Sequence, residues 1–405
     1  MAEEEKKLYP LKFLPIAETF AWGGKHLETR FSKSFIISDL EGNEKPLPKD
    51  TAVAESLELA DLGYRDSQVL EGWLAGNTIG ELMDMYVDRI VGENIFDFFG
   101  RQFPLCVRFI DARQRTPLMV HPDDITAQER YDHLGKTKFW YVLEANENSR
   151  ICLGFKSDTD SAEFYEACQD GSADRLLNVI HPKKGDHFLI KPGTVHCAEN
   201  VVMLEISQSS PLDFCLCNWG REIDEIEFDT SLDLTEALDF IDFKAYTKPE
   251  SKAPQKASSP SVTPLDSCRE FTVNRIDLRN GVHILSENSD SFIIYTCIEG
   301  EAELQFREQQ NSGKVISTSA ITATESAEMR QSGRSASNPA LTPDDTSVSR
   351  CILHIGETVL VPAEVDDFFL VPRRSGTVII ETFIEHLEEK DSYTGLILQR
   401  DDPLL

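Results

Sequence analysis

The stretch KKGDHFLIKPGTVH, residues 183–196, combines a turn, a short apolar strand, a second turn and a histidine. The Gly-Asp pair is typical of the first turn and the Pro-Gly pair of the second. A second stretch, HIGETVLVPAEVDD at residues 354–367, repeats the order of glycine, acid, apolar strand and proline. The repeat predicts two related β-barrels in one chain.

Apolar segments elsewhere in the chain are also short and bounded by turn residues, a pattern typical of barrels and sandwiches. KFWYVLEA (138–145) and RICLGF (150–155) predict a hairpin around the intervening NENS. Apolar residues at three- and four-residue spacing predict a helix at about 78–99. We therefore expect a mainly β protein of two double-stranded β-barrels (jelly rolls) with a helical element near 78–99.

Composition shifts divide the 405 residues into domains. Residues 247–264 are rich in Pro, Lys and Ser and predict a linker. We expect a first barrel domain at 1–246 and a second at 265–405. The second contains a polar insertion at 308–350, whose few apolar groups cannot offset its ordering entropy.

The charge and cysteine content restrict the classes of partner. The formal net charge is −30, from 70 acidic and 40 basic residues, which argues against nucleic acid and anionic membranes as partners. The chain contains no run of 18 apolar residues, so no membrane span is predicted. Nine scattered cysteines without a CxxC pair indicate free thiols in a reducing compartment, so we expect a cytoplasmic protein.

The stretch TPLMVHPDDI, residues 116–125, predicts a strand that ends in a turn. Met119 and His121 are two residues apart and face the same side of such a strand. Pro122 stops strand pairing, and the two aspartates that follow are typical turn formers. A strand end of this kind suits a metal or substrate site, in which a methionine is unexpected.

The barrel motif G(D/E)xxxxPxGxxH resembles that of cupins, and the first 245 residues resemble a type I phosphomannose isomerase. The second half resembles that family only in its barrel pattern. The matching pieces occur in order as WGGKHL (22–27), VAESLEL (53–59), VLEGWLAGNTIGEL (69–82), FPLCVRFIDA (103–112), VHPDD (120–124), GKTKFWYVLEA (135–145), GDHFLIKPGTVH (185–196) and EALDFI (236–241).

The resemblance implies a zinc-dependent aldose–ketose isomerase that interconverts mannose 6-phosphate and fructose 6-phosphate. It also implies that His121 and His196 are metal ligands. The family's remaining ligands, a Gln and a Glu, fall at Met119 and Lys138 in this chain, and its catalytic Arg falls at Cys215. Since a protonated lysine has no acceptor, we expect the zinc site to be weak or absent.

Two further basic residues are candidates by the same resemblance. Lys136 is expected to contact a substrate phosphate, unless it is a solvated lysine of a hairpin. Arg221 matches a family arginine and is expected to order a loop beside the substrate. Glu205 is a candidate substitute for the missing carboxylate ligand.

Other interpretations of these residues remain open. The two histidines are alternatively core residues without a ligand. Met119, His121, His196 and Cys215 together are alternatively a site for a soft metal such as copper.

Two classes of function follow. The first is a sugar-phosphate isomerase with a rebuilt site, in which Lys138 supplies the positive charge that zinc usually gives and Lys136 assists it. Its substrate-binding residues are then Lys136, Met119, Cys215 and Arg221. The second is a non-catalytic protein, either a sugar-phosphate binder or a regulatory partner subunit.

Limited proteolysis tests the domain organisation. We expect the first cuts within 247–264 and 308–350, because polar segments without apolar anchors open most readily. Mass spectrometry of the early fragments identifies the sites. Early cleavage within 180–206 would contradict the assignment of that segment to a barrel.

Overall fold

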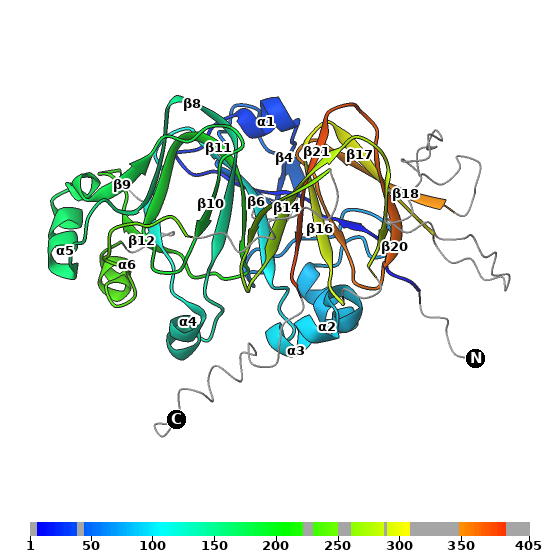
Figure 1. Ribbon diagram of the computed structural model, residues 1–405, viewed down its shortest axis with the longest axis horizontal. Helices are drawn as coiled ribbons and strands as arrows, with labels where there is room; N and C mark the ends of the chain where they lie inside the picture. The colour runs from blue at the N-terminus through cyan, green and yellow to red at the C-terminus, as the bar shows by residue number, and fades with distance from the viewer. Residues whose placement is uncertain are drawn as a thin grey trace, which may run out of the picture. The chain divides into compact units, whose positions relative to one another are not determined.

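The computed structural model describes residues 6–38, 44–221, 230–249, 261–286, 290–307 and 348–385. They form two compact units, each built from curled antiparallel sheets (Figure 1). The first barrel contains the described residues of Phe13–Asp84 and Arg101–Lys252. The second barrel contains those of Met1–Lys12, Met85–Gly100 and Ala253–Ser392.

A nine-stranded sheet forms the first barrel, with the order β10-β8-β11-β6-β5-β2. In addition, β7 pairs with both β11 and β12, and β9 pairs with β8. A separate two-stranded sheet joins β3 to β4. The strands are β2 Ile16–Glu18, β3 Ile36–Ser38, β4 Glu44–Pro46, β5 Glu55–Leu59, β6 Leu105–Ala112, β7 Leu118–Val120, β8 Lys138–Phe155, β9 Leu177–Ile180, β10 His187–Ile190, β11 His196–Gln208 and β12 Phe214–Cys217.

The prediction of a hairpin around NENS is wrong. Both apolar segments belong to β8 and pair with the same strand, β11: Ala145 lies opposite Val201, and Arg150 lies opposite Glu199. The residues between them form an irregularity within the strand. Ser149 stabilises it, because its hydroxyl contacts the Asn200 carbonyl and accepts from the Asn146 N–H. A polar run interrupts the ladder here without reversing the chain.

Short helices flank the first barrel. The α4 and α5 helices begin at aspartate caps, since Asp123 accepts from Thr126 N and Asp160 accepts from Glu163 N. The apolar faces of α5 and α6 pack into one core cluster with β9 and β12. These elements are α1 His26–Phe31, α4 Asp124–Tyr131, α5 Ser161–Gln169, the 3₁₀ helix η1 Ala173–Arg175 and α6 Thr230–Ala237.

Two sheets form the second barrel, in the orders β1-β19-β16-β21-β14-β13 and β15-β20-β17-β18. Their inward faces enclose an apolar core that includes Tyr295, Leu304 and Phe368. The strands are β1 Leu11–Lys12, β13 Val262–Ser267, β14 Thr272–Leu278, β15 Val282–Leu285, β16 Ile293–Glu299, β17 Glu301–Arg307, β18 Val348–His354, β19 Thr358–Val361, β20 Asp367–Pro372 and β21 Thr377–Phe383.

The repeated sequence stretch has the same conformation in both barrels. Gly185 and Gly356 have φ of 90° and 83°, and each precedes a four-residue strand, β10 or β19. A positive φ is the conformation that glycine adopts without steric cost, which explains the glycine at both turns. The two-barrel architecture expected from the repeat is therefore confirmed.

The single helical element expected at 78–99 consists of two helices, α2 Ile79–Val91 and α3 Glu93–Phe99. Gly92 separates them with φ of 92°, and α2 is itself kinked at Tyr86. The apolar periodicity did not reveal these breaks, because it continues through them.

Parts of the expected domain organisation lie outside the described residues. These are 250–260 of the linker and 308–347 of the polar insertion. Within the described part, β13 begins at Val262, inside the expected linker. The domain boundaries at 246 and 265 stay predictions.

Gly193 provides a test of the turn that follows β10. Its φ is +78°, and an added Cβ would lie 2.7 Å from the Phe240 carbonyl oxygen. Gly171 has a similar φ of +76°, but its Cβ would meet nothing within 4 Å. Gly171→Ala should cost about 1–2 kcal/mol from backbone strain, and Gly193→Ala about 1–3 kcal/mol more from the clash. Urea unfolding measures both, and equal losses would contradict the close approach.

Candidate functional site

A cavity of about 1530 Å³ opens in the first barrel, between residues of β5, β6, β7, β8, β11 and β12. Aromatic side chains contribute to its wall, among them Trp22, Tyr64 and Trp140. Six of the residues selected from the sequence line it, whereas Lys136 and His121 are not among its lining residues. The six are Met119, Lys138, His196, Glu205, Cys215 and Arg221.

Strand register places three of these residues in one row. Met119 of β7 lies directly opposite His196 of β11 on one side and Cys215 of β12 on the other. Paired residues of neighbouring antiparallel strands face the same side of a sheet, so the three side chains are adjacent. Met119 is therefore a neighbour of the imidazole, as its position in the motif predicted.

The two histidines lie together with their Nε2 atoms unengaged. The ring centroids of His121 and His196 are 5.0 Å apart. Their Nδ1 atoms lie 2.9 Å from the carbonyl oxygens of Leu212 and Thr194, which assigns the Nδ1 proton to each neutral ring. Both Nε2 atoms are buried and lack a hydrogen-bond partner among the described residues.

Burial keeps both imidazoles neutral. It lowers the pKa of His196 to about 3 and holds the pKa of His121 well below its ordinary value, and in each case Lys138 lowers the pKa further. A neutral imidazole with a free Nε2 is a metal ligand or a hydrogen-bond acceptor. It is a weak base at neutral pH, because its pKa lies far below the pH.

Glu205 of β11 binds the cations at the base of the cavity. Its carboxylate lies 3.3 Å from Lys138 Nζ and 3.2 Å from Arg108 Nε, and it accepts a 2.6 Å hydrogen bond from Trp140 Nε1. Burial alone would raise the pKa of Glu205, but Lys138 and Arg108 lower it to about 2. The carboxylate is therefore ionised. Its Oε2 contacts Lys138 and Trp140, whereas Oε1 has the ion pair with Arg108 and no hydrogen-bond partner among the described residues.

Lys136 is buried rather than solvated, so that alternative is wrong. It is 1% exposed, and its ammonium group donates a 2.8 Å hydrogen bond to Asp213. Burial lowers the pKa of Lys136, whereas Asp213 opposes that shift. Asp213 also lies 3.3 Å from His121 Nδ1. Lys136 thus braces the loop that carries Asp213 behind the imidazole.

Arg221 is directed to its own loop. Its guanidinium donates to the backbone carbonyl of Arg115 and to Asn218 Oδ1, the latter at 2.9 Å. These contacts hold the chain after β12, in agreement with the loop-ordering role expected for it. Its position at the cavity wall leaves a substrate contact as a prediction.

Arg108 was not among the residues predicted from the sequence, and it donates to Glu55 at 2.8 Å as well as contacting Glu205. A signal was present, because this arginine interrupts the otherwise apolar first part of β6, LCVRFI, in which every residue is buried. A charge in a fully buried strand requires a charged partner. The sequence did not say which acid that partner is.

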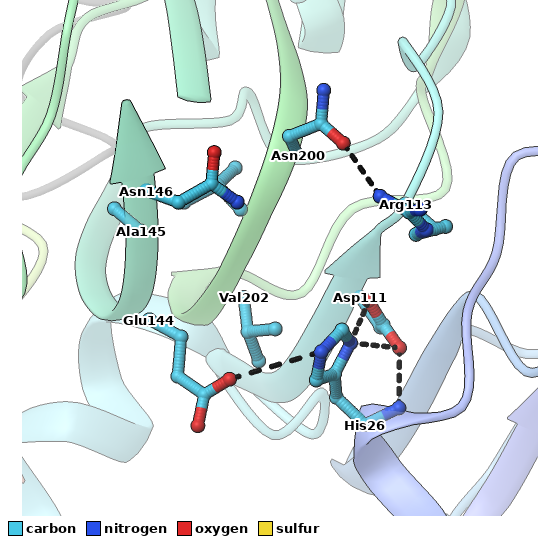
Figure 2. Close-up of a pocket in the computed structure, with 9 residues that line it drawn as sticks. His26, Asp111, Arg113, Glu144, Ala145, Asn146, Asn200 and Val202 are labelled. Carbon is cyan, nitrogen blue, oxygen red and sulfur yellow. Dashed lines mark hydrogen bonds and ion pairs between the residues drawn. The ribbon is translucent and has the colours of Figure 1, made fainter. Parts of the chain in front are cut away.

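A smaller cavity of about 170 Å³ lies beside α1 (Figure 2). Asp111 accepts from the backbone N–H of His26 at 2.7 Å and lies 3.1 Å from its Nδ1, while Nε2 is 3.9 Å from Glu144. An added Cβ on Gly24 would lie 2.3 Å from Asp111. The histidine and aspartate therefore fasten the WGGKHL turn to β6.

Among the described residues, no group of three or more His, Cys, Asp or Glu side chains could hold a metal ion. The His121–His196 pair contributes two such side chains, of which His196 lines the large cavity. Zinc sites with catalytic function have three protein ligands. All nine cysteines are outside disulfides. No helix in the described part of the chain is long and apolar enough to cross a membrane.

Comparisons with known proteins agree with the fold. No family model matches the chain. The probable mannose-6-phosphate isomerase GmuF of Bacillus subtilis is 29% identical over 216 residues, 53% of this chain and 62% of that protein. Mannose-6-phosphate isomerase ManA of the same organism is 26% identical over 297 residues, 73% and 87% of the two chains. The match to the first of these relatives thus spans less than two thirds of its length.

Solved structures are similar across almost the whole chain. A crystal structure of the B. subtilis mannose 6-phosphate isomerase superposes with a TM-score of 0.70 at 22% identity, covering 93% of this chain and 99% of that one. A phosphomannose isomerase variant from Salmonella typhimurium gives a TM-score of 0.64 at 14% identity, with 94% and 100% covered. The fold is that of a two-barrel protein of the cupin type. In sequence and fold, the chain is related to the type I phosphomannose isomerases.

The imidazole environment predicts a specific pH dependence of stability. An unfolded histidine takes up a proton near pH 6.5, whereas folded His196 does so only near pH 3. Its contribution to stability is therefore complete above pH 6.5 and is lost as the pH falls towards 3. His196→Gln should remove up to about 1.4 kcal/mol per pH unit from the slope of stability in that range.

Urea unfolding between pH 7.5 and 5 measures this slope. The exposed His133 provides the matched control, His133→Gln. Parallel profiles for His196→Gln and the native protein would show that His196 takes up its proton at the same pH in the folded and unfolded states.

Proposed function

We propose that the first barrel binds a sugar phosphate of the mannose 6-phosphate and fructose 6-phosphate type, and that the zinc site of the related isomerases is impaired. The observation that carries the proposal is the ion pair between Lys138 and Glu205, 3.3 Å long, in the cavity wall. An ammonium group stands there, at the position that resemblance assigns to a carboxylate ligand.

The donor set does not fit a catalytic zinc ion. His121 and His196 offer two free Nε2 atoms, but Lys138 is a donor only and Glu205 is bound to two cations. A divalent ion beside the imidazoles would also be repelled by Lys138. Lys138 and Arg108 already have carboxylate partners, so their charges are balanced without a metal.

Isomerisation requires a base and positive charge beside the developing enediolate. In the enzyme interpretation, the Lys138 ammonium supplies that charge at the cavity wall, and Lys136 acts indirectly by bracing Asp213 behind His121. The neutral imidazoles are weak bases, because burial lowers their pKa values. Cys215 replaces the second cation with a buried thiol whose pKa burial raises, so it carries no charge. We therefore expect little or no turnover.

A non-catalytic role is the second candidate, as a sugar-phosphate binder or a regulatory partner subunit. Lys138 in place of the carboxylate ligand and Cys215 in place of the catalytic arginine favour this role. A ligand can occupy the cavity although both positions that would support catalysis are altered. As a binder it takes a small-molecule sugar phosphate, and a net charge of −30 opposes nucleic acids and anionic membranes as partners in either role. The nine free cysteines support a reducing, cytoplasmic location.

Restoring the family residues tests the proposal. As purified, the protein should contain well under one zinc per chain and have little mannose-6-phosphate isomerase activity. Met119→Gln with Lys138→Glu should raise zinc affinity by about two orders of magnitude or more, since two ligands return and a repulsive charge is removed. Adding Cys215→Arg should then be needed for turnover. Metal analysis and a coupled isomerase assay measure both properties.

Lys138→Met is the matched control for charge, because it removes the ammonium group without adding a ligand. It should not raise zinc occupancy to one per chain. Stoichiometric zinc in the native protein would contradict the impaired site. Robust activity that survives chelation would instead establish Lys138 as the electrophile and exclude the non-catalytic role.

A further inference from the structure

Two cysteines lie directly opposite each other on neighbouring strands of the first barrel. Cys152 of β8 pairs with Cys197 of β11 in the antiparallel ladder. Both side chains are 1% exposed and belong to the core cluster that also contains residues of α5 and β12. The neighbours of Cys197 along β11, His196 and Ala198, line the large cavity. The thiol pair therefore faces away from that cavity, because successive side chains of a strand alternate between the two faces of the sheet.

The register of the pair suits a disulfide bond. Residues directly opposite in an antiparallel ladder have Cα atoms about 4.5 or 5.5 Å apart, with the larger value where they exchange backbone hydrogen bonds. Disulfide bonds join Cα atoms about 4.4–6.8 Å apart, so both kinds of pair lie within range. The thiols are in contact, since Cys197 donates a hydrogen bond to the Cys152 sulfur. A bond between them requires no change in the pairing of β8 with β11.

Arg115 contacts the same pair. Its Nη2 lies 3.6 Å from the Cys152 sulfur, and its guanidinium also hydrogen-bonds to Cys197. The guanidinium carbon lies 3.4 Å from the ring centre of Trp219, and Nη2 donates a 2.5 Å hydrogen bond to Asp174. The Cys197 thiol and the Arg115 charge lower the pKa of Cys152 to about 7, although burial opposes them. Roughly half of Cys152 is then thiolate at neutral pH, which is the reactive form.

Cys106 shows what the second thiol adds. It is also 1% exposed and also lies beside an arginine, with Arg108 Nη2 3.7 Å from its sulfur. Its partner across the β6–β11 ladder is Ser207 rather than a cysteine, and burial raises its pKa. Burial beside an arginine therefore does not activate a thiol in this barrel, and the facing thiol is what distinguishes Cys152.

We propose that Cys152 and Cys197 are a site of reversible disulfide formation, with hydrogen peroxide as the oxidant. The Cys152 thiolate attacks one peroxide oxygen, the O–O bond breaks, and hydroxide leaves and takes up the proton that the thiol lost. The Cys197 thiol then displaces the hydroxyl group of the resulting sulfenic acid, which forms the S–S bond and a second water. Two thiols thereby give two electrons and two protons to the peroxide. A small-molecule thiol reverses the reaction by exchange.

The site is on the opposite face of the ladder from the sugar-phosphate cavity, so it stands or falls separately from the function proposed above. Both cysteines are outside disulfides in the structure, which is therefore the reduced form. The contacts of Arg115 lead from the buried thiols to Asp174, whose side chain is 47% exposed. A small uncharged oxidant suits a covered site of this kind, whereas a protein oxidant would not reach it.

Peptide mapping of the native full chain tests the site. The protein is treated with hydrogen peroxide, its remaining thiols are alkylated, and it is digested with trypsin and a glutamate-specific protease. Trypsin isolates Cys152 on the peptide ICLGFK (151–156). A cut after Glu199 separates Cys197 from the cysteines that follow it. Mass spectrometry should find the two peptides joined with the loss of two hydrogens, and dithiothreitol should separate them, while Cys106 is recovered alkylated.

Cys197→Ser removes the second thiol but keeps a hydrogen-bond donor beside Cys152. In this variant, peroxide should leave Cys152 as a sulfenic acid that dimedone captures. Cys106→Ser is the matched control and should form the disulfide as the native protein does, with circular dichroism verifying that both variants are folded. An unoxidised Cys152 in Cys197→Ser would overturn its assignment as the nucleophile.

The native protein decides the proposal without any variant. Recovery of Cys152 and Cys197 as alkylated thiols after peroxide has oxidised other cysteines would overturn it. A bond from Cys152 to any other cysteine would overturn it too, as would conversion of Cys152 to a sulfinic acid while Cys197 stays reduced.

Discussion

The Glu205 carboxylate forms ion pairs with two buried cations of the cavity lining, Arg108 and Lys138. It connects β11, which carries it, to Arg108 on β6 and to Lys138 and Trp140 on β8. Removal of one partner from such a network typically costs 3–5 kcal/mol, because a charge is left buried without compensation. Three neighbouring strands of the barrel are therefore held in register by one side chain as well as by their backbone ladders.

This network also separates the cavity into two chemical environments. The cations and carboxylates form ion pairs around Glu205, whereas the imidazoles of His121 and His196 are neutral and lack partners at Nε2 among the described residues. A buried charge with a partner is of little use as a ligand, and an unpartnered neutral nitrogen is available to one. The chemistry of the site is thus set by how the charges pair as much as by which residues are present.

The sequence predicted the architecture because turn chemistry and strand length are local properties. Gly185, Gly356 and the Pro-Gly turn at Gly193 each stand where the backbone requires them. Local patterns failed at NENS, where a polar run forms an irregularity inside β8 instead of a hairpin. They failed again at Gly92, where the chain breaks a helix without interrupting its apolar periodicity.

For the site, motif order identified the residues but not their partners. Met119, Lys138, His196 and Cys215 do share one cavity, as their places in the motifs implied. The pairing of Lys138 with Glu205 and of Lys136 with Asp213 joins segments far apart in the chain, and no local pattern encodes it. Burial of Lys136 was unforeseen for the same reason, since its neighbours in sequence suggest a surface turn.

The ion pair makes position 138 thermodynamically coupled to metal binding. A carboxylate at this position would lie beside the Glu205 carboxylate, and Arg108 would then have to compensate both together with Glu55. Like charges at such a distance destabilise the fold unless a cation enters between them. Metal binding to a chain of that kind would repay the repulsion and raise stability by mass action. With a lysine at this position, the protein is stable without a divalent ion and gains nothing electrostatically from binding one.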